Sequence, residues 1–395
     1  MRIVDVNEFY SPTGGGVRTY IDRKLTVMAA LGHQQIVIAP GREDRVEERP
    51  GGGRIHFVKS PVLPFDSNYG LFKDAGPIHA LLDEYRPDVV ENVAPWRSAQ
   101  IVAEWRGPAM KAWFMHNDNM EAYPKRWLGR VMSEGAIERA FGWYDRFMAK
   151  RLEPFDTVVT NGPVLTERLK KRGLRIDATM TLGIEREHFS PDLRSEALRR
   201  SMLAQCGLPE DAHLLIGIGR HHPEKQWPVV IDAVRRAGTR LPVGLIVLGL
   251  GVDTRTLERH IAASPHVRLF RPVYDRTQLA TVMASADAFI HGGWSEPFGL
   301  VASEALASGL PLIVPDRGGA AAVARPEFGE TYKGGDAYDA AKAIVALLSR
   351  DRPLLRNAAR VAAGKVRSDR EHAEALVAHY QGVIDTKRDG MMSVA

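Results

Sequence analysis

The sequence has almost no cysteine and no long apolar run. Cys206 is the single cysteine in 395 residues, so a disulfide framework is excluded and a reducing cytoplasm is expected. The longest apolar stretch lies near residues 243–250 and is far too short to cross a bilayer as a helix. Residues 1–5 run straight into an apolar strand, so we expect no signal peptide.

A strong charge of either sign is also missing. The chain carries 53 Lys and Arg against 48 Asp and Glu, which gives a formal net charge of +5. This small positive excess suits an anionic substrate or a membrane surface and does not by itself indicate nucleic acid, so we expect no nucleic-acid partner. The chain is longer than one domain with a single hydrophobic core usually is, and two domains are therefore expected.

Short apolar strands alternate with helical stretches along the whole chain. A first series of strands is predicted at residues 3–6, 35–39, 55–58, 88–90, 112–115 and 156–160, and a second at 214–218, 243–248, 267–270, 287–290 and 311–314. This alternation is typical of parallel sheets covered by helices. It predicts an α/β protein with two doubly wound Rossmann-like domains facing a central cleft, with ligands at the carboxyl ends of the strands.

The alternation breaks once. Residues 182–205 contain glycine, proline and many charges and no predicted strand, so we expect a linker there. The predicted domains are therefore residues 1–181 and 206–368. A last helix near 370–384, within residues 369–395, is expected to cross back to the N-terminal domain.

Two glutamates eight residues apart follow one of the strands. Glu296 falls at the strand-to-helix turn, just before Pro297, and Glu304 falls on the next helix. Between them lies a helix N-terminus, which attracts anions. A continuous helix would separate the two carboxylates by roughly 12 Å. Such an arrangement fits a sugar–diphosphate–ribose ligand; the plain alternative is a solvated helix face with two surface glutamates.

A glycine run follows the first strand. Gly14, Gly15 and Gly16 would allow backbone N–H groups to approach an anion closely. The run lacks the G-x-G-x-x-G spacing of dinucleotide sites, and no acidic residue clearly ends the second strand. A simple tight turn is the alternative.

A basic loop follows the first strand of the second domain. Arg220 and Lys225 place two cations at a strand end and a helix start, where they could neutralise a diphosphate leaving group. A solvated basic loop is the alternative. The chain has no Asp-x-Asp pair, and the adjacent His221 and His222 have no second cluster at ligand spacing. We therefore expect no metal and no cofactor.

Two further features are less specific. His116 ends the strand at 112–115, where it could hydrogen-bond a sugar hydroxyl or could simply be a loop histidine. The segment 123–155 is both aromatic and basic. One helical stripe in it, formed by Ile137, Phe141, Tyr144 and Met148, is expected to be core. An anionic membrane surface could be contacted through Lys125, Arg126, Trp127 and Arg130, and Trp143 lies nearby.

With these parts together, the chain resembles family 4 of the retaining glycosyltransferases, which have the GT-B fold. The resemblance spans nearly the whole length. It is carried by the Glu-x7-Glu element from Glu296 to Glu304, continued through Pro311, and supported by residues 14–16, 219–225 and 182–191.

The resemblance implies a role for each matching residue. It implies that Glu296 contacts donor-sugar hydroxyls and Glu304 holds the ribose, while Arg220 and Lys225 bind the diphosphate. His116 is placed near the sugar at the reaction centre. The remaining implied donor contacts are Gly15, Gly16, Val273, Phe298, Gly299 and Leu300.

The resemblance also implies the chemistry. A hexose would pass from a UDP- or GDP-linked donor to an acceptor hydroxyl, with retention by same-face substitution and no protein nucleophile. Double-displacement glycosidases hold their carboxylates about 5 Å apart, much closer than the spacing expected here. The family usually has glycine where this chain has Gln226, and often where it has Arg271, which leaves the donor base open.

The acceptor expected is a lipid or a glycan of the cell envelope, reached from the cytoplasm or the inner face of the membrane. Two alternatives remain at this point. A nicotinamide-dependent oxidoreductase also uses doubly wound domains, although the degenerate glycine loop argues against it. A non-catalytic protein that binds sugar nucleotides is the other, and the retained Glu296, Arg220 and Lys225 argue against that.

Overall fold

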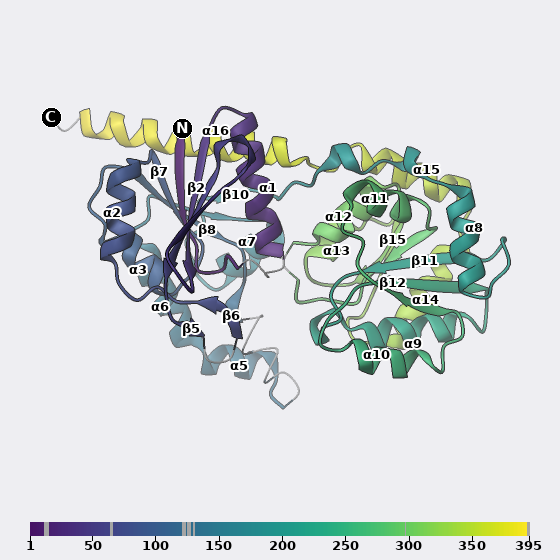
Figure 1. Cartoon of the computed structure of the whole chain (residues 1–395). Helices are drawn as coiled ribbons and strands as arrows, with labels where there is room; N and C mark the ends of the chain where they lie inside the picture. The colour runs from purple at the N-terminus through teal and green to yellow at the C-terminus, as the bar shows by residue number, and fades with distance from the viewer. Residues whose placement is uncertain are drawn as a thin grey trace. The chain divides into compact units, whose positions relative to one another are not determined.

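The computed structural model describes residues 1–11, 16–63, 66–120, 124, 128, 131–296 and 298–392. The chain forms two compact units (Figure 1). The first comprises Met1–Leu182 together with Asp369–Ala395, and the second comprises Gly183–Ser368. Each unit is a mainly parallel sheet covered by helices on both faces.

The first unit is built on an eight-stranded sheet. Its order is β10-β9-β8-β7-β1-β2-β4-β3, parallel except for the edge strand β3, which runs antiparallel to β4. Apolar runs form its buried central strands because both faces are covered. The strands are β1 Arg2–Val6, β2 Gln34–Gly41, β3 Arg45–Glu48, β4 Arg54–Lys59, β7 Val89–Asn92, β8 Met110–Met115, β9 Thr157–Thr160 and β10 Ala178–Thr179; β5 Val62–Leu63 and β6 Asp66–Gly70 form a separate antiparallel pair.

Helices cover this sheet on both faces. They are α1 Gly16–Ala30, α2 Gly76–Tyr85, α3 Arg97–Glu104, α5 Glu134–Ala140, α6 Gly142–Leu152, α7 Pro163–Lys171 and α16 Asp369–Met392, with the short 3-10 turn η1 Pro50–Gly52. One face packs α2, α3, α6 and α7 against strand residues such as Val4 and Trp113. The other face carries α1 and α16.

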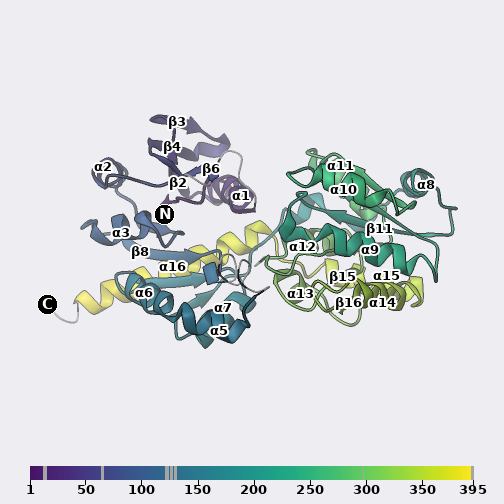
Figure 2. The same ribbon diagram turned by 90° about the horizontal axis from the view of Figure 1, so that it is seen from below.

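The C-terminal helix is part of the first unit. Figures 1 and 2 both show α16 lying along this unit. It contacts α1 and β8, and its Leu376 and Tyr380 are fully buried. The Tyr380 hydroxyl donates a hydrogen bond of 2.8 Å to Glu91, which also receives the buried Lys24 ammonium at 2.6 Å. The last helix therefore packs within the first unit.

The second unit is built on a six-stranded parallel sheet. Its order is β13-β12-β11-β14-β15-β16. Successive strands are added on one side of β11 up to β13 and on its other side from β14 onward, so the strand order reverses between β11 and β14. The strands are β11 His213–Ile218, β12 Val243–Leu248, β13 Val267–Phe270, β14 Ala288–Ile290, β15 Leu312–Pro315 and β16 Gly329–Tyr332. Such a reversal point is where open α/β sheets bind ligands, beyond the carboxyl ends of the strands.

Two helical layers enclose this sheet (Figure 1). One layer contains α9 Trp227–Ala237, α10 Thr254–Ile261 and α14 Ala337–Leu348. The other contains α8 Glu196–Gln205, α11 Arg276–Ala284, α12 Leu300–Ala307, α13 Gly319–Val323 and α15 Arg352–Ala363. Three 3-10 turns complete the unit, η3 Arg186–His188, η4 Pro191–Leu193 and η5 Pro223–Lys225.

The structure differs from the expected linker. Residues 182–205 contain α8, and the segment from Gly183 onward belongs to the second unit. Ile184, Phe189 and Leu203 are buried in that unit's core, and Ile184 also forms a β-bridge with Ser368. The segment therefore packs as part of the second unit. Its apolar side chains are scattered along the sequence without helix or strand periodicity, so their burial in the core is not visible from the local pattern.

Candidate active site

The candidate site lies at the reversal point of the second sheet. Strands β11 and β14 are parallel neighbours, with Leu215 opposite Ala288 and Ile216 opposite Phe289. Their carboxyl ends consequently open at the same edge of the sheet. The loop after β11 carries Arg220 and Lys225, and the loop after β14 carries Glu296. Residues 71 positions apart are thereby brought together.

Two glycines allow these loops to touch. A Cβ atom on Gly292 would lie 2.6 Å from the Lys225 carbonyl oxygen, and one on Gly293 would lie 2.9 Å from the Glu224 oxygen. Both contacts are with backbone, which cannot rotate away. The loop after β14 is also held by Tyr332, whose buried hydroxyl donates a 2.5 Å hydrogen bond to the His291 carbonyl. Close backbone packing thus sets the position of the two charged side chains.

At the centre of the site, one carboxylate oxygen faces two nitrogen atoms. Lys225 Nζ donates to Glu296 Oε2 at 2.7 Å, and His291 Nε2 lies 3.1 Å from the same oxygen. The side chains of Lys225 and His291 are 11% and 2% exposed, and that of Glu296 is 22% exposed. The cluster is therefore mostly removed from water yet still reachable.

The environment keeps Glu296 ionised. Burial acts to raise the pKa of this carboxyl group, but the Lys225 charge and the His291 contact outweigh it and hold the pKa well below its usual range. A carboxylate that is ionised throughout the physiological range accepts hydrogen bonds and does not serve as a general acid. This matches a role in holding hydroxyl groups.

The N-terminus of α12 follows Glu296 directly. Gly299 is its N-cap and adopts the left-handed conformation with φ of 64°. A Cβ atom there would also lie 2.7 Å from the backbone of Gly319, whose amide donates a 2.6 Å hydrogen bond to the Glu296 carbonyl. Only glycine satisfies both demands. Since α12 starts at Leu300, Glu296 lies before the helix, and the 12 Å spacing expected for a continuous helix does not apply.

The second glutamate is held by an arginine from another element. Arg276, the first residue of α11, donates from Nη2 to Glu304 Oε1 at 2.7 Å, and its Nε lies 2.8 Å from Glu185 Oε2. Its guanidinium also lies over the Phe189 ring, 4.9 Å from the centroid. Glu304 itself is only 5% exposed. The carboxylate is thus fixed in direction by Arg276 and accessible only over a small area.

The other residues of the second unit that were predicted to contact the donor differ in their exposure and in their partners. Arg220 is 60% exposed and pairs with Glu224 at 2.9 Å, so the structure does not bring it to Glu296. Phe298 and Leu300 are half-buried at the start of α12. Val273 follows β13 and packs partly against the core of this unit. Pro297 lies outside the described residues.

The residues predicted in the first unit are less easily reached. His116 follows β8 as expected, but its side chain is 1% exposed and packs against the rings of Tyr20 and Phe114 at 4.9 and 4.7 Å. Burial, with Lys24 adding to it, lowers the pKa of His116 to about 3, so its ring is neutral. Gly16 is exposed at the start of α1. Gly15 lies outside the described residues.

Sequence reasoning missed two members of the site. His291 was visible as the last polar residue before the glycine pair, and its position one residue after a buried strand could have marked it. Arg276 offered no such signal, because it is one arginine among many and reaches Glu304 only through the packing of α11 against α12. Within the described part of the chain, no group of three or more His, Cys, Asp and Glu side chains is arranged to hold a metal ion.

The sequence matches two domain families over most of its length. Residues 15–183 match the glycosyl transferase 4-like domain, and residues 199–365 match glycosyl transferases group 1. The chain is 28% identical over 317 residues to a GDP-mannose-dependent α-(1-6)-phosphatidylinositol dimannoside mannosyltransferase of Mycobacterium tuberculosis, covering 80% of this chain and 79% of that protein. It is 27% identical over 332 residues to a GDP-mannose-dependent α-mannosyltransferase of the same species, covering 81% and 80%.

The fold is shared with solved structures of low sequence identity. Sucrose-phosphate synthase from Thermosynechococcus elongatus superposes with a TM-score of 0.77 at 18% identity, over 98% of this chain and 99% of that one. The predicted GT-B fold is confirmed, as is the predicted family, and the oxidoreductase alternative is not supported. This chain belongs to family 4 of the glycosyltransferases and is a hexosyltransferase.

Proposed function

We propose that this enzyme transfers mannose from GDP-mannose to a hydroxyl group of a mannosylated glycolipid, with retention of the anomeric configuration and without a metal. The observation that carries the proposal is the Lys225–Glu296 ion pair just before the N-terminus of α12. A cation, a fixed carboxylate and a helix N-terminus meet there within one loop cluster. These are complementary to the diphosphate and to the hydroxyl groups of a nucleotide sugar.

The diphosphate would be held by charge and by backbone. The first amides of α12 have no partner within the helix, so a phosphate bound there would gain both hydrogen bonds and the favourable helix dipole. Lys225 would then neutralise the charge that develops as the bond between the anomeric carbon and the phosphate oxygen breaks. Arg220 is exposed on the same loop and could turn from Glu224 to the phosphate.

Glu296 would position the sugar and would not attack it. The carboxylate oxygen that receives Lys225 also faces His291, which fixes its direction. A carboxylate engaged by a lysine at 2.7 Å is a poor nucleophile but a good acceptor for sugar hydroxyls. Retention would then come from same-face substitution, in which the departing diphosphate accepts the proton of the acceptor hydroxyl.

The donor base and sugar are proposed from the relatives. The two mannosyltransferases that cover about four fifths of this chain are named as GDP-mannose-dependent. Glu304, ionically paired with Arg276 and nearly buried, would accept hydrogen bonds from the ribose hydroxyls of GDP. Val273, on the loop after β13, would contact the base through its backbone.

The acceptor is proposed to lie at a membrane surface on the cytoplasmic side. One relative is named for a phosphatidylinositol dimannoside acceptor. Lys125, Arg126, Trp127 and Arg130, predicted to contact anionic lipid, lie outside the described residues. The adjoining helix α6 exposes Trp143 by 56% and Phe147 by 37%. In the described part of the chain, no helix has both the length and the apolar character to cross a membrane.

The cationic side chains near these rings support a surface contact. Arg146 and Lys150 on α6 are exposed, and Arg151 lies over the Phe147 ring at 4.9 Å from its centroid. Ile137 and Met148 of the predicted core stripe are buried, while Phe141 and Tyr144 are half-buried. The helix therefore separates a packed face from an aromatic and basic one, as interfacial helices do.

A donor screen tests the function. Thermal unfolding in the presence of GDP-mannose, UDP-glucose and NADH should show the largest rise in midpoint with GDP-mannose, because binding stabilises the folded state by mass action. The wild type should then slowly release GDP from GDP-mannose. Preference for UDP-glucose would replace the proposed donor, and binding without GDP release, even with glycolipid present, would support the non-catalytic alternative.

Vesicle sedimentation tests the membrane contact. The wild type should pellet with anionic phosphatidylglycerol vesicles and stay in solution with neutral phosphatidylcholine vesicles, and Trp143→Ala with Phe147→Ala should pellet less. Val252→Ala is the control, because Val252 is an apolar side chain in the second unit that is 81% exposed. Equal pelleting with both lipids, or no effect of the double change, would contradict the proposal.

A further inference from the structure

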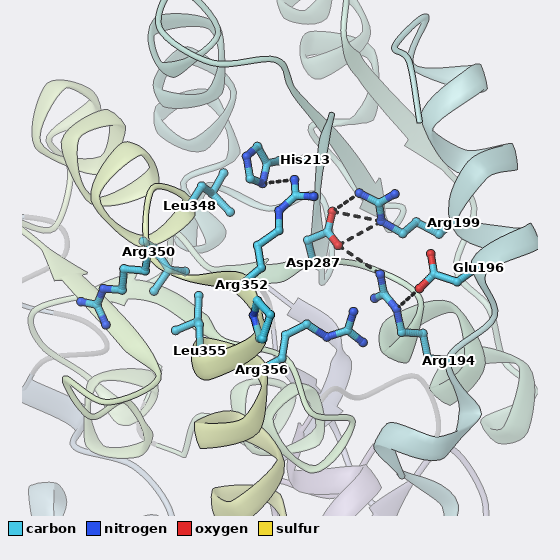
Figure 3. Close-up of a pocket in the computed structure, with 12 residues that line it drawn as sticks. Arg194, Glu196, Arg199, His213, Asp287, Leu348, Arg350, Arg352, Leu355 and Arg356 are labelled. Atoms are coloured by element: carbon cyan, nitrogen blue, oxygen red, sulfur yellow. Dashed lines mark hydrogen bonds and ion pairs between the residues drawn. The ribbon is translucent and has the colours of Figure 1, made fainter. Parts of the chain in front are cut away.

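A second polar cavity lies at the opposite end of the same sheet from the active site. It has a volume of about 400 Å³ and is lined by five arginines, Arg194, Arg199, Arg350, Arg352 and Arg356, together with Glu196, His213, Asp287 and a few apolar residues. His213 opens β11 and Asp287 immediately precedes β14, so the cavity sits at the amino ends of these strands. Figure 3 shows the side chains that converge there.

Two of the arginines are structural. Arg199 forms a two-pronged contact with Asp287, with Nη2 at 2.7 Å from one oxygen and Nε at 3.0 Å from the other, and it donates to two backbone carbonyls as well. Arg194 bridges Asp287 at 3.2 Å and Glu196 at 2.5 Å. Although burial opposes it, the bonds from Arg199 hold the pKa of Asp287 below its ordinary value. These four charged groups, two arginines and two carboxylates, satisfy one another.

The charges on the other side of the cavity are not balanced in this way. Arg350 pairs with Glu330, outside the cavity. Arg352 donates from Nη2 to the His213 Nδ1 at 2.8 Å and to the Asp211 carbonyl at 3.2 Å, both neutral acceptors. Burial, and then Arg352, lower the pKa of His213, so this ring stays neutral. Among the described residues, Arg352 thus has no carboxylate partner.

Arg356 is the least compensated of the five. Within the described ranges it makes no hydrogen bond or salt bridge, and Figure 3 shows its side chain extending toward Arg194. Burial and the neighbouring Arg194 charge lower the pKa of Arg356 by more than the nearby Asp287 and Glu196 charges raise it, so its positive charge is only partly compensated. A group in such a position gains free energy when an anion arrives.

We propose that this cavity binds a small phosphate-bearing molecule, with its phosphate between Arg352 and Arg356. Guanidinium groups bind phosphate through paired N–H donors, and two arginines without carboxylate partners match its two charges. Leu348 and Leu355 supply an apolar surface for the rest of the molecule. The alternative is a solvated arginine cluster that attracts only bulk counterions.

This site is distinct from the donor site. The six residues of β11 separate His213 at the cavity from the loop that carries Lys225, and six residues of strand span roughly 20 Å. The two sites share β11 and β14 but no side chain. A molecule in the cavity would therefore leave the donor contacts free.

Calorimetric titration with inorganic pyrophosphate tests the proposal, because pyrophosphate can enter both sites. The wild type should show two binding events. Lys225→Ala should keep the event that belongs to the arginine cavity, and Arg352→Ala with Arg356→Ala in the Lys225→Ala background should weaken that event at least about tenfold. Arg360→Ala is the matched control, since Arg360 lies on the same helix, is exposed and pairs with Asp192 away from the cavity.

The outcomes separate the alternatives. Titrations with inorganic phosphate and with a sugar phosphate at the same ionic strength should show tighter binding of the sugar phosphate if the apolar wall takes part. Arg356→Ala alone should leave the thermal midpoint without ligand unchanged or higher, because a repelled charge is removed. One binding event that disappears with Lys225→Ala, or equal weakening by Arg360→Ala, would overturn the proposal.

Discussion

Lys225 and Glu296 meet at 2.7 Å although they lie on two loops that follow different strands. Each side chain is placed by backbone packing of glycines 292 and 293 against the Lys225 loop. In the structure the pair is closed, with His291 on the same oxygen. On the proposed function, a donor would meet a lysine and a glutamate already aligned, so its binding would require little ordering of these side chains.

Lys225→Ala should lower kcat/KM for the nucleotide sugar by roughly 10²–10³, since one charged contact to a developing diphosphate is lost. Glu296→Gln should lower it as well, and the double variant should lose less than the product of the two single losses, because the residues act as one unit. Steady-state kinetics of GDP release check this. Fully multiplicative losses would show that the two side chains act independently.

Gly292→Ala should damage both stability and activity. The added methyl group would lie 2.6 Å from the Lys225 carbonyl and 2.8 Å from a Val230 methyl carbon, so the two loops must separate. Overpacking of this kind costs about 1–3 kcal/mol and should also lower kcat. Thermal unfolding and donor kinetics measure the two effects. Gly142→Ala is the control, because a methyl group there meets no neighbour within 4 Å.

Gln226→Gly should be neutral or stabilising. Gln226 adopts the left-handed conformation with φ of 52° at the N-cap of α9, which costs a side-chain-bearing residue about 1 kcal/mol or more. Glycine removes that strain, although its greater conformational entropy in the unfolded chain offsets part of the gain in stability. This strain would account for the glycine that the family resemblance implies at this position. Chemical denaturation would contradict the explanation if the variant lost more than about 1 kcal/mol.

The stability of the first unit should depend on pH through Asp5. Burial, with Glu91 adding to it, raises the pKa of this fully buried carboxyl group to about 7. Between pH 4 and pH 7 the folded state therefore holds a proton that the unfolded state has lost, and the free energy of unfolding falls as pH rises through this window.

Asp5→Asn removes this dependence. The unfolding free energy of the wild type relative to the variant should fall by up to about 4 kcal/mol between pH 4 and pH 7 and stay level above pH 7. Thermal midpoints of both proteins across this range provide the measurement. A constant difference would mean that Asp5 has an ordinary pKa in the folded state.

Local pattern predicted much of the fold. The apolar runs that became β2, β11 and β12 are continuous because both faces of each strand are covered, and such runs are visible without any partner. The edge strands β3 and β10 were not predicted, because β3 is largely exposed and β10 has only two residues. The prediction that Glu304 lies on a helix that follows a turn was correct, because the turn and the helix are set by residues close in sequence.

What the sequence by itself determined is the alternation of strands and helices, the doubly wound class, and the order of Glu296, a helix start and Glu304, because these depend on neighbours within a few residues. Tertiary structure alone decided that Arg276 reaches Glu304, that His291 shares an oxygen of Glu296 with Lys225, and that the His116 side chain is buried. It also gathered five arginines from distant segments around one cavity. The physical reason is that charge–charge contacts and burial depend on distances in space, which a chain acquires only when its sheets and helices have packed.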